Sequence, residues 1–273
     1  KEGFISVIAG FSFIGIMLGV ATLIIVMAVM NGFRNELIQK ILGVNGHVIV
    51  YRVADPFTDY EEATARLSKV PGVKSVAPLI EGQAMISSSA VTLGGLIRGV
   101  SEGAIRRMPL VADNVRFGTF DGFDDSESLA IGIRLANMLR VTAGDVITLV
   151  SPRGASTPFG IAPRIKRYKV AAIFELGMSE YDKSMIFMPL KEAQRYFSRP
   201  DQVDVLEVLV DEPEKVGELL QPLQAAGGTN LSFTDWRRRN ETFFTVLEVE
   251  RNVMFIILSL IVLVAALNII SGL

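Results

Sequence analysis

The side chains that most often bind metals or perform catalysis are sparse in this sequence. Cysteine is absent and His47 is the only histidine, so a metal site would have to be built from carboxylates alone. The acidic run 121–129, DGFDDSESL, offers carboxylates, but it lacks the ligand spacing and the central glycine of an EF-hand loop. We therefore interpret this run as a solvated loop, and His47, at the start of a predicted strand, as a structural residue.

Motifs for nucleotide binding are also missing. The segment 94–99, GGLIRG, does not match the dinucleotide-binding pattern G-x-G-x-x-G, and no Walker A sequence occurs in the chain. We expect a non-catalytic protein with no catalytic residue, no metal site and no cofactor of its own. The formal charge of −2, from 27 basic and 29 acidic side chains, gives no long-range attraction to nucleic acid, so nucleic acid is not an expected partner.

The segment 156–170, STPFGIAPRIKRYKV, combines a turn with an aromatic residue and several cations. Pro158 presets φ at the bend and Gly160 allows positive φ, so the tip that carries Phe159 is held before any partner binds. An exposed aromatic side chain at such a tip suits an apolar pocket in another protein. The alternative is an ordinary hairpin whose Phe159 folds back on its own domain.

Two apolar runs predict membrane-spanning helices, in keeping with 50% hydrophobic and 21% charged residues. Residues 4–30 carry no charge, and at ~1.5 Å per residue their ~40 Å length exceeds the ~30 Å hydrocarbon core of a bilayer. This run is about twice as long as the apolar core of a cleaved signal peptide, so we expect a retained anchor. The second run, 253–273, stops where the sequence stops, and we expect the chain to be a fragment.

Between the two runs the pattern predicts a mixed α and β domain. Alternating segments such as 47–52, 144–150 and 167–176 are typical of strands, and 59–70 is typical of an amphipathic helix. Because strands and helices interleave without a regular βαβ rhythm, we expect an α+β fold rather than a doubly wound sheet. Two subdomains are expected, with the hairpin 144–176 in the inserted one.

Both apolar runs are predicted to continue as helical stalks outside the membrane. Thr234 or Asp235 can cap the helix that approaches the second run, and Leu247, Glu250 and Met254 then fall on one stripe of it. The predicted divisions of the chain are a first transmembrane helix 1–33, a stalk 34–46, a central α+β domain 47–234, a second stalk 235–252 and a second transmembrane helix 253–273.

Three stretches of the chain carry a resemblance to a known family. VMNGFRNEL closes the first span, DWRRRNETFFTVLEVERNVM leads into LSLIVLVAALNIISGL, and SPRGASTPFGIAPRIKRYKVAAIFE covers the hairpin. Together they resemble the LolC/LolE family of lipoprotein-releasing ABC transporter permeases, and GIRLANMLRV-x-x-GD resembles MacB-like domains more widely. The resemblance implies a MacB-like α+β periplasmic domain between two transmembrane helices, as the N-terminal half of a four-span permease. It also implies the inner membrane of a Gram-negative bacterium, with the N-terminus cytoplasmic and the central domain periplasmic.

The resemblance further implies a set of partners. They are a LolD-type ATPase that binds ATP and magnesium, a second permease that is identical or paralogous, the periplasmic carrier LolA, triacylated lipoproteins as cargo, and membrane lipids. Hook-bearing members of the family bind LolA through a protruding hairpin, which here corresponds to residues 151–170. The implied hook residues are Pro158, Phe159, Gly160, Ile161 and Pro163, and the implied basic pad beside them is Arg153, Arg164, Lys166 and Arg167.

The resemblance places the acyl chains of the cargo between the periplasmic ends of the first two spans of paired subunits. The implied cavity residues are Met27, Met30, Phe33, Phe244, Met254 and Ile257. Methionine suits this role because its flexible, polarizable side chain adapts to varied shapes. Helix packing or lipid contact is the alternative for each residue. Two other functions remain open: a MacB-like or FtsX-like mechanotransmission permease with another cargo, and a two-span receptor with a periplasmic sensor domain.

Overall fold

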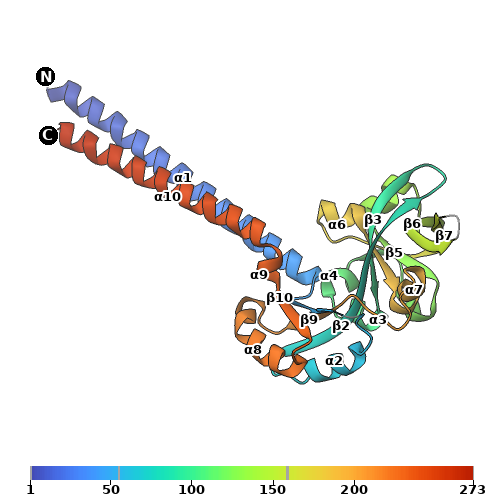
Figure 1. The fold of residues 1–273 in the computed structure, drawn as a ribbon. Coiled ribbons are helices and arrows are strands. Elements are labelled where there is room, and N and C mark those ends of the chain that lie inside the picture. The colour runs from blue at the N-terminus through green and yellow to red at the C-terminus, as the bar shows by residue number, and fades with distance from the viewer. Residues whose placement is uncertain (1, 55, 158–159, 273) are drawn as a thin grey trace. The chain divides into compact units, whose positions relative to one another are not determined.

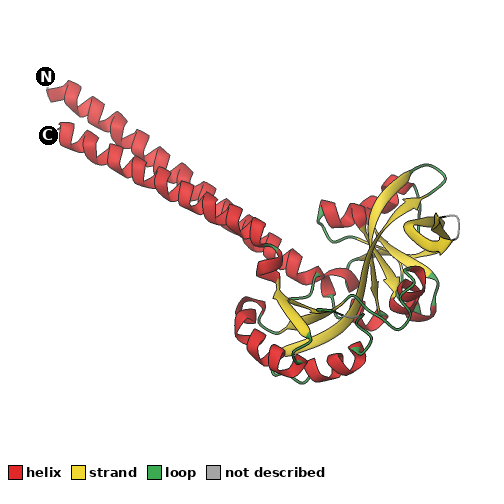
Figure 2. Ribbon diagram, viewed as in Figure 1, coloured by secondary structure: helices red, strands yellow, loops and turns green. Residues whose placement is uncertain are grey.

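The computed structural model describes residues 2–54, 56–157 and 160–272, and it divides into two compact units (Figure 1). The first unit comprises residues 1–39 and 237–273, and the second comprises residues 40–236. Helices dominate the first unit, whereas the second holds every described strand (Figure 2).

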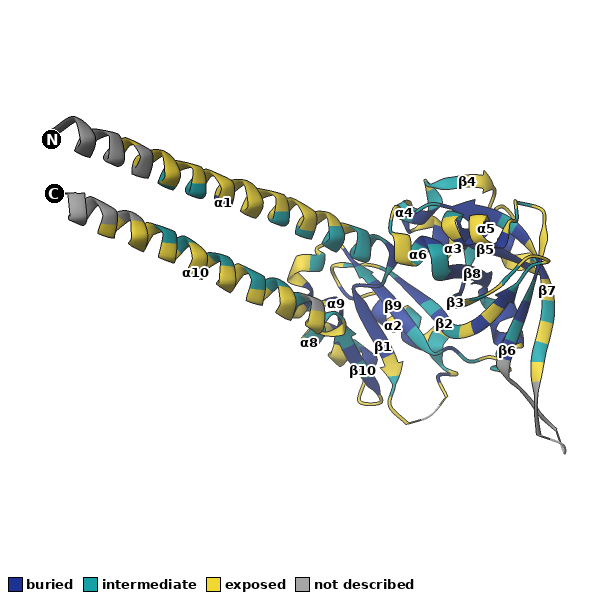
Figure 3. Ribbon diagram, turned by 90° about the horizontal axis from the view of Figure 1, so that it is seen from above, coloured by how far each residue is buried: buried dark blue, intermediate teal, exposed yellow. Residues whose placement is uncertain are grey.

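The first unit is built from two long helices. Helix α1 (Glu2–Val44) contributes its residues up to 39, and α10 (Glu241–Gly272) follows the short helix α9 (Trp236–Arg239). Most of their described side chains are exposed (Figure 3). Among the described residues, the segment Phe13–Val44 is the one helix long and apolar enough to cross a membrane. It overlaps the first predicted span; the second, 253–273, lies partly outside the described side chains and stays a prediction.

The described strands of the second unit form one mixed sheet in the order β10-β1-β9-β2-β3-β8-β5-β7-β4, with β6 paired to β2 and β7. Most neighbours are antiparallel, but β3 is parallel to β8 and β5 is parallel to β7. The strands are β1 (Val48–Arg52), β2 (Val73–Ser87), β3 (Thr92–Val100), β4 (Val115–Gly118), β5 (Ser128–Gly132), β6 (Val146–Thr157), β7 (Gly160–Phe174), β8 (Met185–Pro189), β9 (Val205–Val210) and β10 (Leu231–Asp235).

Strand β2 belongs to two groups of strands and thereby joins two subdomains. Its residues 73–79 pair with β9, and its residues 80–87 pair with β3. The group β10-β1-β9-β2 packs against α2 (Tyr60–Leu67) and α8 (Val216–Gly227). The other group carries α3 (Glu102–Arg106), α4 (Pro109–Ala112), α5 (Ile133–Leu139), α6 (Ser179–Ser184) and α7 (Leu190–Tyr196). The predicted α+β fold is confirmed, with the hairpin of β6 and β7 in the second group.

The second subdomain contains a closed ring of strands. Strand β6 pairs with β7 along its length and with β2 between Thr148 and Val150, so the pairs β2-β3-β8-β5-β7-β6 return to β2. Closure leaves no free edge among these strands. The fully buried side chains on the strands of this ring include Ile86, Ile97, Leu149 and Ile186. A packed ring of this kind is a firm base for the hairpin that continues beyond it.

A buried ion pair lies where α1 meets the sheet of the second unit. Arg98 on β3 is fully buried, and its Nη2 lies 2.5 Å from Oε1 of Glu207 on β9. Its Nη1 donates to the carbonyl oxygen of Val44, at the end of α1, over 2.8 Å. The backbone N–H of Gly46 donates to the same Glu207 oxygen. Arg98 thus satisfies one of the carbonyls that a helix end leaves without an intrahelical partner.

The helix that approaches the second apolar run starts close to its predicted position. Thr234 or Asp235 was expected to cap it; both are the last residues of strand β10, and Asp235 directly precedes α9, which begins at Trp236. The buried indole of Trp236 donates from Nε1 to the carbonyl oxygen of Pro213 over 2.9 Å. Asp235 therefore ends the strand that pairs with β1 and also occupies the position from which an aspartate can cap a helix.

His47 has the structural role that its position predicts. Its buried Nδ1 accepts a hydrogen bond from the backbone N–H of Val210 over 2.9 Å, so the ring must be neutral at that nitrogen. Its own carbonyl oxygen accepts from the N–H of Trp236. Burial is the largest influence on the side chain and lowers the pKa of His47 below its ordinary value.

The lowered pKa of His47 predicts a loss of stability in mild acid. Its contribution is fully present above the unfolded pKa, about 6.5, and is lost as the pH falls through the lower folded pKa. We expect the Tm of the full chain to fall between pH 7.5 and 5.0, and to fall less in His47→Gln, whose amide does not titrate. Thermal unfolding at several pH values measures this, and equal pH dependence in both proteins would contradict it.

Candidate functional site

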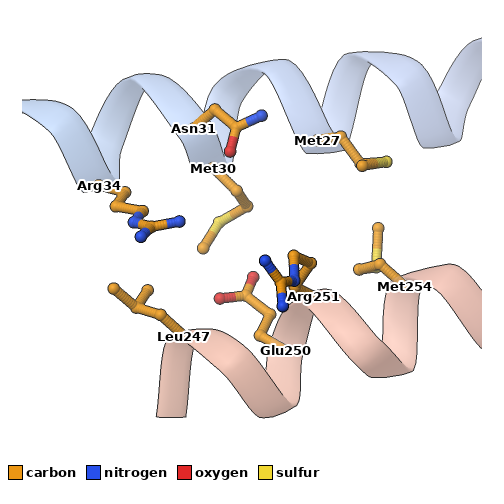
Figure 4. A pocket seen from close by; sticks show the side chains of 8 residues that line it. All are labelled: Met27, Met30, Asn31, Arg34, Leu247, Glu250, Arg251 and Met254. Atoms are coloured by element: carbon orange, nitrogen blue, oxygen red, sulfur yellow. The ribbon is translucent and has the colours of Figure 1, made fainter. Parts of the chain in front are cut away.

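A small cleft opens between the two long helices of the first unit (Figure 4). Each helix contributes four residues at the spacing i, i+3, i+4 and i+7, which places them on one helical face. Met27 and Met254 point into the space between the helices (Figure 4). The cleft has a volume of about 60 Å³ and is lined by Met27, Met30, Asn31, Arg34, Leu247, Glu250, Arg251 and Met254.

The lining of this cleft changes from apolar to charged along the helices. Met27, Met30 and Met254 belong to the two uncharged runs of the sequence. Arg34 and Glu250 lie beyond those runs. The cleft therefore matches an amphiphile, with its apolar part against the methionines and its polar part against the charges.

The cleft contains half of the predicted cavity residues. Met27, Met30 and Met254 line it, whereas Phe33, Phe244 and Ile257 are not among its lining residues. Leu247 and Glu250 were predicted only to share a stripe with Met254, and Asn31, Arg34 and Arg251 were not predicted. Their helical spacing from the methionines is the signal that would have found them, because any residue three or four positions away shares the same face.

The hairpin of β6 and β7 lies in the second unit and holds the other predicted site. Among the described strand pairs, residues 155–157 and 160–162 pair only with each other. The register shifts between Ser151 and Ala155, so residues 152–154 stand opposite Pro163. Pro152 and Pro163 cannot donate to a strand ladder, which explains the interruption at this point. The outer part of the hairpin is thus a two-stranded extension of the ring.

Several predicted hook and pad residues lie outside the described part of this hairpin. Pro158 and Phe159 lie outside the described residues. Gly160 and Ile161 belong to β7 and Arg153 belongs to β6, but their side chains lie outside the described part. Of the hook residues, Pro163 alone has a described side chain, and it is exposed.

Arg164, one of the predicted pad residues, binds the end of helix α7. Its Nη1 lies 2.5 Å from the carbonyl oxygens of both Arg195 and Tyr196, and its Nη2 donates to Oγ of Ser198 over 2.6 Å. These carbonyls belong to the last turn of α7, where a cation is favoured by the helix dipole. Arg164 is therefore held within its own domain.

Lys166, another predicted pad residue, lies between two carboxylates. Its Nζ is 2.8 Å from Oε1 of Glu192 on α7 and 3.0 Å from Oε1 of Glu127. Burial lowers the pKa of Lys166, but the hydrogen bonds to Glu192 and Glu127 outweigh burial and raise the pKa overall. The same Glu192 oxygen accepts a hydrogen bond from the buried hydroxyl of Tyr168. The pKa of Tyr168 is raised, with burial as the larger cause and this hydrogen bond as the second.

The remaining side chains of β7 face the other way. Ile165 and Arg167 are exposed, and Ile165 keeps 64% of its surface accessible. Within the described part of the chain, Arg167 has no ion-pair partner. Of the four predicted pad residues, Arg164 and Lys166 thus bind groups of their own domain. Arg167 is exposed and available to a second protein.

The acidic run 121–129 serves local contacts. Asp121 accepts from Arg106 over 2.6 Å and from Thr119 over 2.8 Å, and the bonds from Thr119 and then Arg106 lower the pKa of this exposed carboxyl. Asp124 accepts from the backbone N–H of Glu102. Within residues 2–54, 56–157 and 160–272, no cluster of three or more His, Cys, Asp or Glu side chains that could hold a metal is found.

Comparison with known proteins assigns the chain to a family. The family model of the MacB-like periplasmic core domain matches residues 9–226. The chain belongs to this family. As a MacB-like protein with a helix apolar enough to cross a membrane, it is a membrane protein with a periplasmic domain. The periplasmic region of MacB from Actinobacillus actinomycetemcomitans superposes with a TM-score of 0.47 at 12% identity, over 76% of this chain and 94% of that chain.

Among curated proteins, this MacB-like chain is similar to LolC and LolE. It is 30% identical to the lipoprotein-releasing system transmembrane protein LolC of Neisseria meningitidis, over 100% of this chain and 66% of that protein. It is 28% identical to the lipoprotein-releasing system transmembrane protein LolE of Haemophilus influenzae, over 100% of this chain and 67% of that protein. The resemblance to the LolC/LolE family is confirmed. The MacB-like chain spans about 66% of the length of the LolC relatives.

Proposed function

We propose that this protein is a membrane subunit of an ATP-driven complex that releases lipoproteins from the inner membrane of a Gram-negative bacterium. The observation that carries this proposal is the similarity of the whole chain to LolC and LolE, two transmembrane proteins named for lipoprotein release. In this proposal a separate LolD-type ATPase binds ATP and magnesium and supplies the energy. This chain contributes the cargo cleft and the hairpin that meets the carrier.

Triacylated lipoproteins are the proposed cargo of the cleft between α1 and α10. The cleft has an apolar end and a charged end, as an acylated protein requires. Its volume of about 60 Å³ accommodates only a few water-sized groups, at roughly 10–15 Å³ each, and not three acyl chains. A second permease, identical or paralogous, therefore supplies the remaining wall of the cargo site in this proposal.

The hairpin 151–170 is the proposed contact with a LolA-type carrier. Its outer strand pairs extend beyond the ring, and the exposed Ile165 and Arg167 lie on the face directed away from α7. An apolar side chain next to a cation suits a carrier surface that combines an apolar pocket with an acidic rim.

Release from vesicles tests the proposed function directly. The full chain, co-expressed with its ATPase, is reconstituted into vesicles that contain a triacylated lipoprotein, and release into solution is measured with and without a LolA-type carrier. We expect release to require both ATP and the carrier. An assembled complex that hydrolyses ATP but leaves the lipoprotein in the vesicles would contradict the proposal.

Photo-cross-linking tests the cargo cleft. A photoreactive residue in place of Met254, which lines the cleft, is expected to cross-link to the triacylated lipoprotein. The matched position is Val249, which is on the same helix, is 56% exposed and is not among the lining residues. We expect at least about fivefold less product there, because dispersion contacts require close approach. Equal products at both positions would show that the cleft does not select the cargo.

A second candidate function follows from the family model itself. A MacB-like permease with another cargo would share the periplasmic domain and the long helices. In the vesicle assay such a protein would assemble with its ATPase without releasing the lipoprotein, which separates the two functions.

A further inference from the structure

The base of the hairpin 151–170 is attached to helix α7 by two cations from one strand. Alternation along β7 sends Arg164, Lys166 and Tyr168 towards α7, while Ile165 and Arg167 point to solvent. The strand therefore has one face for anchoring and one face for a partner. The sequence alone, which shows only a cluster of positive charges, does not distinguish the two.

The anchoring face leaves little charge for a second protein. The guanidinium of Arg164 has three oxygen acceptors, at 2.5, 2.5 and 2.6 Å. The ammonium of Lys166 faces Glu192, whose side chain is 3% exposed, and Glu127, whose side chain is 59% exposed. Arg195 shares both carboxylates, at 3.3 Å from Glu192 and 3.8 Å from Glu127, so the cluster contains two positive and two negative charges and has little field at longer range.

Helix α7, to which the hairpin is attached, is itself tightly packed in the subdomain. Strand β3 approaches it so closely that a Cβ on Gly99 would lie 2.2 Å from Cβ of Ala193. On the next residue of the helix, Nε2 of Gln194 donates to the carbonyl oxygen of Gln202 over 3.1 Å. A strand held to this helix has its direction determined by the packed core of the subdomain.

We propose that Arg164 and Lys166 are positioning residues, which fix the direction of the hairpin by binding α7 and do not contact the carrier. The expected effect on carrier binding rests on the proposed function, whereas the attachment of the hairpin to α7 does not. A hairpin held in one direction before binding loses less entropy on docking, so the anchor raises affinity without touching the partner. The contact itself is left to the tip and to the outward face.

Distance measurements between spin labels test the anchor without any carrier. The chain has no cysteine, so Thr157→Cys and Lys191→Cys can be labelled on the hairpin and on α7 in the otherwise unchanged full chain. We expect Lys166→Met and Arg164→Ala to broaden the distance distribution. The double variant Lys166→Met/Glu192→Gln is expected to narrow it again, because no unpaired charge remains buried and the glutamine oxygen still accepts from Tyr168.

Lys169 supplies the matched control. It is exposed on the same strand, and Lys169→Met removes the same charge by the same substitution. We expect it to leave the distance distribution unchanged. Broadening by Lys169→Met equal to that by Lys166→Met, or no broadening by Lys166→Met, would overturn the inference.

Binding of a purified LolA-type carrier to the full chain in detergent separates positioning from contact. We expect Lys166→Met to weaken binding by about tenfold, the effect of losing a preorganised segment, and Lys166→Met/Glu192→Gln to restore most of it. If Lys166 contacts the carrier, the double variant stays weak, since residue 166 is still uncharged, and the inference fails. If the unmodified chain binds no carrier while the spin labels behave as expected, the proposed function fails and the anchor stands.

Discussion

Replacing Arg98 with methionine is expected to lower the free energy of unfolding by about 3–5 kcal/mol, the usual cost of removing one partner from a buried ion pair. The cost arises because Glu207 would keep its charge inside the protein, with only the N–H of Gly46 still donating to it. The carbonyl of Val44 at the end of α1 would lose its hydrogen bond as well. Its Nε also lies 3.5 Å from Oε1 of Glu81 on β2, so four elements, α1, β2, β3 and β9, meet at this one side chain.

The single tryptophan of the chain makes this measurement specific to the second unit. Trp236 is buried, with its indole bonded to Pro213, so its fluorescence reports unfolding of that unit in the full chain. The matched control is Arg116→Met, which removes an arginine from an exposed pair with Glu175 and is expected to cost less than about 1 kcal/mol.

A double variant separates the charge from the packing. In Arg98→Met/Glu207→Gln the buried carboxylate of Glu207 is gone, the second partner Glu81 is 30% exposed, and the glutamine oxygen still accepts from Gly46, so a substantial part of the stability is expected to return. If Arg98→Met unfolds no more readily than Arg116→Met, the ion pair does not hold the end of α1 to the sheet.

Arg98 also shows why part of the fold could not be predicted from the sequence. Elements with a regular local pattern, such as the strand predicted at 167–176 and the helix predicted at 59–70, were predictable, and they correspond to the end of β7 and to α2. Arg98 lies in GGLIRG, and its partner Glu207 is over 100 residues away in the sequence. The residues next to Arg98 therefore do not indicate that this arginine is buried. The local periodicity of a sequence does not determine which distant residues form an ion pair.

The candidate site was predictable to a similar extent. The methionines of the cleft were implied by the family resemblance, and Arg34 and Arg251 follow from helical spacing once one wall is known. The roles of Arg164 and Lys166 do not follow, because their partners belong to α7, which is distant in the sequence. The sequence shows a cluster of basic residues, and tertiary contacts separate Arg164 and Lys166, which bind α7, from the exposed Arg167.

Replacing Phe159 with glutamate is expected to abolish carrier binding while leaving the fold intact. A charge at the turn predicted between the ends of β6 and β7 costs little in the free protein, because water solvates it. The same charge would be costly in an apolar pocket of the carrier, where it has no partner. An anchor residue of this kind carries a large share of the binding energy, so we expect a loss of ~100-fold or more.

Capture of the full chain by an immobilised LolA-type carrier measures this effect. Phe117→Glu is the matched control, because Phe117 is 58% exposed on β4 and receives the same new charge away from the hairpin. Unchanged Trp236 fluorescence in both variants would verify that the second unit stays folded. Undiminished capture of Phe159→Glu would contradict the anchoring role of Phe159 and would leave the exposed Ile165 and Arg167 as the proposed contact of the hairpin.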